Sequence, residues 1–222
     1  MTPRPDLLLL DVNETLSDLT PLQARLVDVG LAEHDLSGWF AGVLRDGFAL
    51  QLTGRCADFA EVASAHLCQL LGAAGRSIDD DAVYHVVSGF TQLSLHPDVV
   101  PGLTRLAASG VRLATLTNGA TASSERMFDE AGLRPVLERR MSVQEAGAWK
   151  PDPRSYAYAL AELDVPATSA ALAASHPWDV HGAEQAGLAG VWIDRTGTPW
   201  PQVYDEPDLA VRDFVELADA WT

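Results

Sequence analysis

Polar and charged side chains stand at or near the ends of several apolar segments of this sequence. They are Asp11, Thr117-Asn118, Lys150 and the run Ser175–Asp179. A lysine beside a carboxylate keeps it ionised and therefore nucleophilic, and a nearby hydroxyl and amide can orient it. A single aspartate would be explained as a turn cap, but the whole set favours catalysis. The pattern predicts that Asp11 is a carboxylate nucleophile held near Lys150.

The apolar segments in front of these residues predict the elements that position them. Leu7–Leu10 is a continuous apolar run, typical of a strand that is covered on both faces. After His96-Pro97, further strand candidates alternate with helices. These candidates are Val111–Leu116, Val136–Val143, Ala170–Ala174 and Val191–Asp194. The alternation predicts an α/β fold with a doubly wound parallel sheet, in which ligands bind at the carboxyl ends of the strands.

A helical block separates the first strand from the others, and no segment within it is typical of a strand. Residues that begin or cap helices recur in this block at Thr20-Pro21, Ser37, Asp58 and Asp79–Asp81. We therefore expect a Rossmann-like core made of residues 1–16 and 97–222. Residues 17–96 are expected to form an inserted helical cap that closes over the active edge of the sheet.

The composition limits the classes of partner. The chain has 222 residues, of which 47% are hydrophobic, and a formal net charge of −16. This charge repels nucleic acid and anionic membrane surfaces, so neither is expected as a partner. No stretch approaches the roughly 20 apolar residues of a spanning helix, and Leu7–Leu10 is too short for a signal sequence, so we expect a cytoplasmic protein. Cys56 and Cys68 lack metal-ligand or redox spacing and are expected to be buried thiols.

The ordered motifs resemble the haloacid dehalogenase superfamily over essentially the whole chain. The segments that match its motifs, in order, are Asp11–Thr15, Thr117-Asn118, Lys150-Pro151 and Asp179. The segments most similar to the L-2-haloacid dehalogenase branch are Trp149–Asp152 followed by Tyr156, and Trp178-Asp179 followed by Gly182-Ala183. The resemblance implies a small anionic 2-haloacid and halide as ligands. It also implies a homodimer, because members of the family are often dimers.

The resemblance further implies a two-step hydrolysis without a metal or redox cofactor. Asp11 would attack the halogen-bearing carbon of an L-2-haloacid or a haloacetate, fluoroacetate included, and would displace halide. Water would then hydrolyse the resulting ester and release a 2-hydroxy acid. The residues implied for catalysis beside Asp11 are Thr15, Lys150 and Asp179.

The resemblance also implies which residues bind the substrate. Arg45, beside Phe40 and Leu44 on a cap helix, would bind the substrate carboxylate and the halide; a surface arginine lying over apolar neighbours is the alternative. Tyr156 would donate to the substrate carboxylate or the nucleophile, with core packing as the alternative. The other expected substrate contacts are Val12, Asn13, Thr117, Asn118, Ser175 and Trp178.

His176 departs from the family pattern, in which an asparagine is common at this position and the aspartate of the fourth motif, here Asp179, positions water. Glu14 occupies another loop at the same edge. A glutamate paired with an imidazole is a general-base arrangement in which the carboxylate fixes the tautomer. We therefore predict that His176 activates the hydrolytic water and that Glu14 orients His176. The alternative is that Glu14 caps the turn and His176 makes a structural hydrogen bond.

Two other functions stay open. Most members of the superfamily are magnesium-dependent phosphatases, in which an aspartate two residues after the nucleophile protonates the leaving group. Asn13 stands at that position and has no carboxylic proton to donate, and Asp179 alone is a poor donor set for a divalent cation. The third candidate is a catalytically lapsed domain that binds a small anion. Retention of Asp11, Thr117, Lys150 and Asp179 together counts against that candidate.

Overall fold

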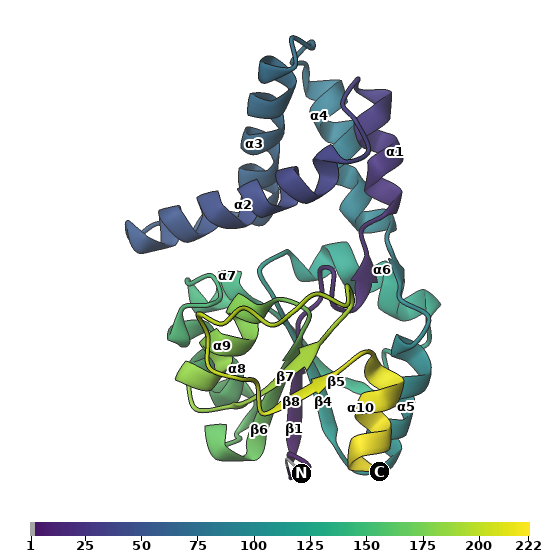
Figure 1. The fold of residues 1–222 in the computed structure, drawn as a ribbon, viewed down its shortest axis with the longest axis vertical. Coiled ribbons are helices and arrows are strands. Elements are labelled where there is room, and N and C mark those ends of the chain that lie inside the picture. Colours follow the sequence, from purple (N-terminus) through teal and green to yellow (C-terminus); the bar gives the residue numbers. More distant parts are fainter. Residues whose placement is uncertain (1–2) are drawn as a thin grey trace.

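The computed structural model describes residues 3–222, and at its centre is a six-stranded sheet in the order β5-β4-β1-β6-β7-β8 (Figure 1). Every pair of neighbouring strands in this sheet is parallel. Helices α8 and α9 cover one face of the sheet, and α5 and α10 cover the other (Figure 1). The protein therefore has the α/β fold with a doubly wound, Rossmann-like sheet that the sequence predicts. The strands are β1 (Leu7–Leu10), β4 (Arg112–Thr117), β5 (Leu137–Ser142), β6 (Ala170–Ala174), β7 (Ala189–Ile193) and β8 (Leu209–Val211).

The helices fall into two groups. Those that accompany the sheet are α5 (Val99–Ala108), α6 (Thr121–Glu130), α7 (Val143–Ala146), α8 (Pro153–Leu163), the short 3-10 helix η2 (Ala167–Ser169), α9 (Pro177–Gln185) and α10 (Phe214–Trp221). Those that follow β1 in the sequence are α1 (Pro21–Asp28), α2 (Asp35–Leu52), α3 (Phe59–Ala73), α4 (Asp80–Val87) and the 3-10 helix η1 (Ser88–Gln92). We call α1–α4 the cap helices; they lie beyond the carboxyl ends of the strands (Figure 1).

Strand β1 lies in the middle of the sheet because all four of its leucine side chains are apolar and both of its faces are covered. Leu7–Leu10 have no exposed surface. Leu10 pairs with Thr115 of β4 on one side and with Ala173 of β6 on the other. The next residue, Asp11, therefore emerges between the carboxyl ends of β4 and β6, where the sequence predicts the active edge.

Three details of the sequence prediction are wrong. Ser37 does not cap a helix, because α2 already begins at Asp35, where an acid in the first turn complements the helix dipole. Two short strands, β2 (Ser17–Asp18) and β3 (Ser94–Leu95), pair antiparallel where the chain enters and leaves the helical block. Strand β8 was not predicted; only three residues long, with Ala210 exposed, it carries little apolar signal. Asp58 and Asp79 do cap α3 and α4, as predicted.

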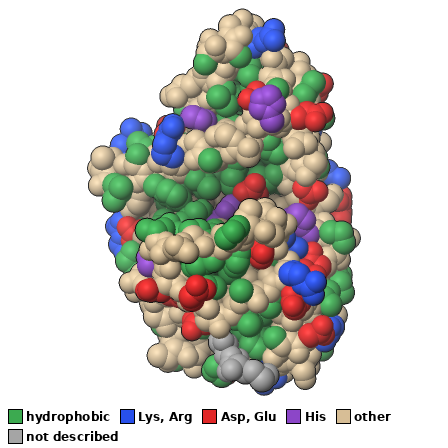
Figure 2. Space-filling view, in the orientation of Figure 1, with side chains coloured by type: hydrophobic (Ala, Val, Ile, Leu, Met, Phe, Trp, Pro, Cys, Tyr) green, Lys and Arg blue, Asp and Glu red, His purple; other side chains and the backbone are tan. Residues whose placement is uncertain are grey.

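Helix α2 docks on the segment that carries Lys150. Gly47 lies so close to Trp149 that a Cβ atom added to Gly47 would stand 2.2 Å from the indole. The side chain of Gln51 accepts a hydrogen bond from the Trp149 amide at 3.1 Å and donates to Asp152 at 3.1 Å. Figure 2 shows hydrophobic side chains gathered on both sides of the boundary between the cap helices and the core. The position of α2 is therefore coupled to the position of the Lys150 segment.

Two further expectations can be compared with the structure. Within residues 3–222, no helix is both long and apolar enough to cross a membrane. Cys56 and Cys68 are free thiols, and both are half-buried rather than fully buried as expected. Neither side chain lies at the end of a strand of the sheet.

Candidate active site

The centre of the site is a buried cluster of one ammonium group and two carboxylates. Lys150 Nζ donates to Asp11 Oδ1 at 2.8 Å and to Asp179 Oδ2 at 2.6 Å. The side chains of Lys150 and Asp179 are fully buried, and that of Asp11 is 6% exposed. Lys150 is also the only lysine in the sequence. The predicted neighbours Asp11, Lys150 and Asp179 are thus brought into direct contact.

The protonation states of this cluster follow from burial and from the attraction between its charges. Burial alone would raise the pKa of Asp11, but the charges of Lys150 and His176 and the hydrogen bonds from Lys150 and Thr15 bring that pKa below its ordinary value. Burial alone would lower the pKa of Lys150, but the two carboxylates raise it. Burial, aided by the charge of Asp11, raises the pKa of Asp179 in spite of Lys150. Asp11 is therefore the more readily ionised carboxylate of the pair.

Thr15 orients the second carboxylate oxygen of Asp11. Its hydroxyl donates to Asp11 Oδ2 at 2.6 Å and accepts from the Ser175 amide at 2.9 Å. The guanidinium of Arg195 donates to the Thr15 carbonyl from Nε at 3.2 Å and from Nη2 at 2.8 Å. Arg195 in turn pairs with Asp98 at 2.7 Å, directly after the point where the chain returns from the cap helices. The loop that carries Asp11 is therefore held by hydrogen bonds from Ser175, which follows β6, and from Arg195, which follows β7.

The Asn118 side chain positions Lys150 by hydrogen bonding to the backbone of Lys150. The Asn118 side chain accepts from the Lys150 amide at 2.9 Å and donates to the Lys150 carbonyl at 3.2 Å. The Thr117 hydroxyl accepts from the Gly119 amide at 3.0 Å and shapes the turn that follows β4. Both residues also line the cavity above Asp11, so a role in substrate binding remains a prediction for them.

Tyr156 contacts the buried cluster through Asp179. Its fully buried hydroxyl donates to Asp179 Oδ1 at 2.7 Å. Burial and the neighbouring charge of Asp179 raise the pKa of Tyr156 well above its ordinary value, so the phenol stays protonated. The structure thus places Tyr156 in the core, where its hydroxyl donates a hydrogen bond to Asp179. Tyr156 does not line the chamber over Asp11.

Glu14 and His176 face one another beside Asp11. Glu14 Oε2 lies 3.5 Å from His176 Nε2. The His176 ring is stacked between Phe40, at 6.0 Å between centroids, and Trp178, at 5.2 Å. Glu14 has a φ of 62°, in the left-handed region that costs a non-glycine residue roughly 1 kcal/mol. Burial raises the pKa of Glu14, and His176 opposes that rise.

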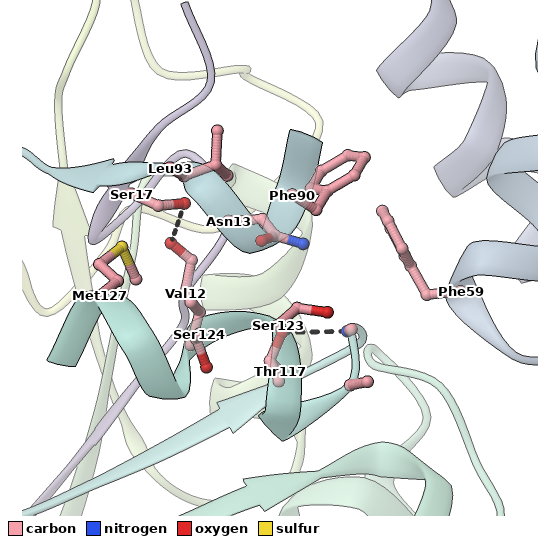
Figure 3. A pocket seen from close by; sticks show the side chains of 12 residues that line it. Val12, Asn13, Ser17, Phe59, Phe90, Leu93, Thr117, Ser123, Ser124 and Met127 are labelled. Atoms are coloured by element: carbon pink, nitrogen blue, oxygen red, sulfur yellow. Dashed lines mark hydrogen bonds between the residues drawn. The ribbon is translucent and has the colours of Figure 1, made fainter. Parts of the chain in front are cut away.

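A small chamber lies over Asp11. Its walls are the residues Asp11, Asn13, Phe40, Leu44, Phe59, Thr117, Asn118, His176 and Trp178. The free space in the chamber is about 10 Å³, which is room for about one water molecule. A second recess continues from it through Asn13, Phe59 and Thr117 toward Ser123 at the start of α6, as Figure 3 shows. Phe40, Leu44 and Phe59 come from α2 and α3, so the cap helices supply the roof of the chamber.

Arg45 is not at the site, and this corrects the prediction. Its side chain is 66% exposed and pairs with Asp46 at 2.8 Å. Successive residues of a helix are rotated by about 100°, so the burial of Leu44 over the chamber turns Arg45 outward. Within residues 3–222, no arginine lines this chamber. The remaining predicted residues Val12, Asn13, Ser175 and Trp178 do lie around Asp11.

Three residues of the site were missed from the sequence. Arg195 directly follows the strand candidate Val191–Asp194, so the rule that found Asp11 could have found it. Phe40 and Phe59 form the roof of the chamber, and an apolar side chain on a helix carries no signal that distinguishes a lid from a core.

The residues present do not fit the magnesium ion of the phosphatase branch. Lys150 Nζ bridges the two carboxylates that would ligate the ion, and the other oxygen of Asp179 accepts from Tyr156. Among residues 3–222, no group of three or more His, Cys, Asp and Glu side chains is arranged to hold a metal. The ammonium group of Lys150 stands where a cation would otherwise balance Asp11.

The sheet order, the lysine-held carboxylate after β1 and the helices above it define a hydrolase with a Rossmann-like core. The profile of the haloacid dehalogenase-like hydrolases matches residues 5–187, and the chain belongs to this family. The (S)-2-haloacid dehalogenase 1 of Pseudomonas sp. (strain CBS-3) is 31% identical over 192 residues, 86% of this chain and 82% of that relative. The (S)-2-haloacid dehalogenase H-109 of Pseudomonas putida is 30% identical over 171 residues, 76% and 75% of the two chains.

Solved structures agree with these relatives. One L-2-haloacid dehalogenase superposes with a TM-score of 0.90 at 25% identity, and the match covers 99% of each chain. The predicted resemblance to the L-2-haloacid dehalogenase branch is therefore confirmed, as is the prediction that the chain is an enzyme of this hydrolase family.

Proposed function

We propose that the protein hydrolyses small 2-haloacids or haloacetates to 2-hydroxy acids and halide. The observation that carries this proposal is the ionised Asp11 carboxylate, held by Lys150 and Thr15 under a small, largely apolar chamber. Two relatives that are (S)-2-haloacid dehalogenases support it. The chamber favours a substrate of two or three carbon atoms because three of its walls are Phe40, Leu44 and Phe59.

The reaction proceeds in two steps. An Asp11 oxygen attacks the carbon that bears the halogen; a carbon–oxygen bond forms, the carbon–halogen bond breaks, and halide leaves with the electron pair. Water then attacks the carbonyl carbon of the Asp11 ester and gives up a proton. The bond between that carbon and the ester oxygen breaks, and the alkoxide takes a proton and leaves as the 2-hydroxy acid. Asp11 regains its carboxylate with one oxygen from water, and the second proton of that water is released to solvent.

Binding of the substrate carboxylate needs a donor other than Arg45. We assign it to the recess between Thr117 and Ser123, at the N-terminus of α6 (Figure 3). Ala120 precedes α6 and offers no side-chain cap, and the helix dipole favours an anion there; of the first-turn amides, that of Ser123 already donates to the Ala120 carbonyl at 3.1 Å. The halide would lie toward His176, Trp178 and Asn118, which line the opposite wall.

We assign activation of the hydrolytic water to His176, with Glu14 orienting the ring. Nε2 faces Glu14, which leaves Nδ1 to take the proton of the water. His176→Asn should therefore release one equivalent of halide and then accumulate the ester. The matched control is His85→Asn, which removes a similar pair with Asp28, at 2.9 Å, on the cap helices. An unchanged steady-state rate in His176→Asn would refute this role.

The decisive experiment is halide release from both enantiomers of 2-chloropropionate, from chloroacetate and from fluoroacetate, with EDTA present. We expect release from the L-enantiomer or from a haloacetate, reduced to background by Asp11→Asn. A phosphate ester with magnesium is tested beside it, and phosphate release without halide release would favour the phosphatase. Carboxylate binding without turnover would favour a lapsed anion-binding domain. The homodimer, the cytoplasmic location and the cap boundaries at 17 and 96 stay predictions.

A further inference from the structure

A larger, polar cleft lies on the other side of His176. Its volume is about 370 Å³, enough for several water molecules. Exposed residues at its rim include Thr20, Ser37 and Thr196, and its inner wall includes Glu14 and Ser175. The cleft and the chamber over Asp11 share a single lining residue, which is His176.

We propose that this cleft delivers the hydrolytic water to the Asp11 ester, while the substrate occupies the chamber. This inference rests on the proposed function, because it assigns a route to the second step of that reaction. Once the acyl group is bound to Asp11, a chamber with about 10 Å³ of free space and walls such as Phe40 and Trp178 has no room for a water molecule. Water must then come from another direction, and the cleft borders the same histidine.

The inner wall of the cleft lies directly behind the nucleophile. Ser175 donates from its amide to the Thr15 hydroxyl, and this hydroxyl donates to Asp11 Oδ2 at 2.6 Å. Arg195, which also lines the cleft, binds the Thr15 carbonyl. One layer of residues therefore separates the cleft from the carboxylate that becomes the ester.

The residues that line the two cavities fit this division between a water route and a substrate chamber. The cleft carries Glu14, His96, Arg195 and several hydroxyl groups, which can hydrogen-bond a file of water. The chamber carries Phe40, Leu44, Phe59 and Trp178 beside the polar side chains of Asn13, Thr117 and Asn118, and its small free volume leaves little space for water once a substrate is bound. His176 thus forms the boundary between the larger cleft and the smaller chamber, and it is the residue to which a water from the cleft can transfer its proton.

The test is to fill the cleft from its rim. Thr20→Trp and Ser37→Trp change exposed side chains that do not contact Asp11, and Ser77→Trp is the matched control at an exposed position outside the cleft. Rapid-quench halide release measures formation of the ester, and the mass of the intact protein measures its accumulation. Thermal denaturation shows whether each variant is folded, and two rim positions are used so that one folded variant suffices.

We expect steady-state turnover to fall about tenfold or more in the cleft variants, with one equivalent of halide still released rapidly and the ester visible by mass. Ser77→Trp should match the wild type. Unchanged turnover in a folded cleft variant would overturn the inference. Equal slowing of ester formation would also overturn it, because the cleft would then be the substrate entrance. Failure of the wild type to release any halide would instead refute the proposed function itself.

Discussion

Replacing Lys150 by methionine removes one ammonium group that serves both the nucleophile and the fold. Methionine keeps an unbranched apolar stem in a site where the lysine side chain has no exposed surface. The change leaves Asp11 and Asp179 buried side by side, without the hydrogen bonds they accept at 2.8 and 2.6 Å. Removing one partner of a buried ion pair costs about 3–5 kcal/mol. We therefore expect the free energy of unfolding to fall by about that amount at pH 8.

The loss should depend on pH in a defined direction. Without Lys150, burial and mutual repulsion place the pKa values of Asp11 and Asp179 above those of the unfolded chain, which are about 3.9. Such groups contribute stability below the unfolded pKa and lose it as the pH rises through the folded pKa. In the wild type, the lowered pKa of Asp11 contributes stability above the unfolded pKa that is lost on acidification. The difference in free energy of unfolding between the wild type and Lys150→Met should therefore be large at pH 8 and small near pH 4.

Urea denaturation of both proteins at about pH 4.5 and at about pH 8 measures the difference between their free energies of unfolding. Adding Asp179→Asn to Lys150→Met should recover part of the loss at pH 8, because one buried charge disappears. Arg212→Met is the control, since Arg212 is 81% exposed and its pair with Glu216 is screened by solvent. An equal loss at both pH values, or a loss below about 1 kcal/mol at pH 8, would refute the reasoning.

Three other changes test separate parts of the structure. Arg195→Gln removes the donors to the Thr15 carbonyl and should lower kcat about tenfold with little change in KM, while Arg195→Lys should recover part of the rate. Gly47→Ala sets a Cβ atom 2.2 Å from Trp149 and should lower the free energy of unfolding by about 1–3 kcal/mol in urea. Burial, aided by nearby carboxylates, raises the pKa of Glu184 to about 7. The contribution of Glu184 to wild-type stability should therefore fall as the pH rises from about 4.5 to 7, and Glu184→Gln should gain about 1 kcal/mol at pH 8 and nothing at pH 4, after allowance for solvent screening.

The elements that position the site could be predicted because a parallel sheet constrains them strongly. A strand buried on both faces must be apolar throughout, so Leu7–Leu10 and Ala170–Ala174 are recognisable from composition alone. Parallel strands also place their carboxyl ends at one edge, so Asp11, Thr117 and Ser175 had to be neighbours. The same rule covers Arg195, which follows β7.

The orientation of side chains on the cap helices could not be predicted in the same way. Phe40, Leu44 and Arg45 lie within six residues of one helix, and which of them faces the nucleophile depends on how α2 docks on the core. That docking depends on Gly47 against Trp149, a contact about a hundred residues apart in the sequence. A resemblance to a family predicts an arginine near this position, but it does not predict which way the helix turns that arginine.

The outward position of Arg45 changes the charge balance of the proposed reaction. Lys150 stands against Asp11 and Asp179, so the cluster has an excess of negative charge before an anionic substrate binds. The neutral donors proposed for the substrate carboxylate, at the N-terminus of α6, must then offset this charge in the first step, whereas His176, paired with Glu14, acts as the base of the second step. Rapid-quench measurements should therefore show ester formation unchanged and ester hydrolysis slowed in His176→Asn, and a parallel slowing of both steps would contradict this account.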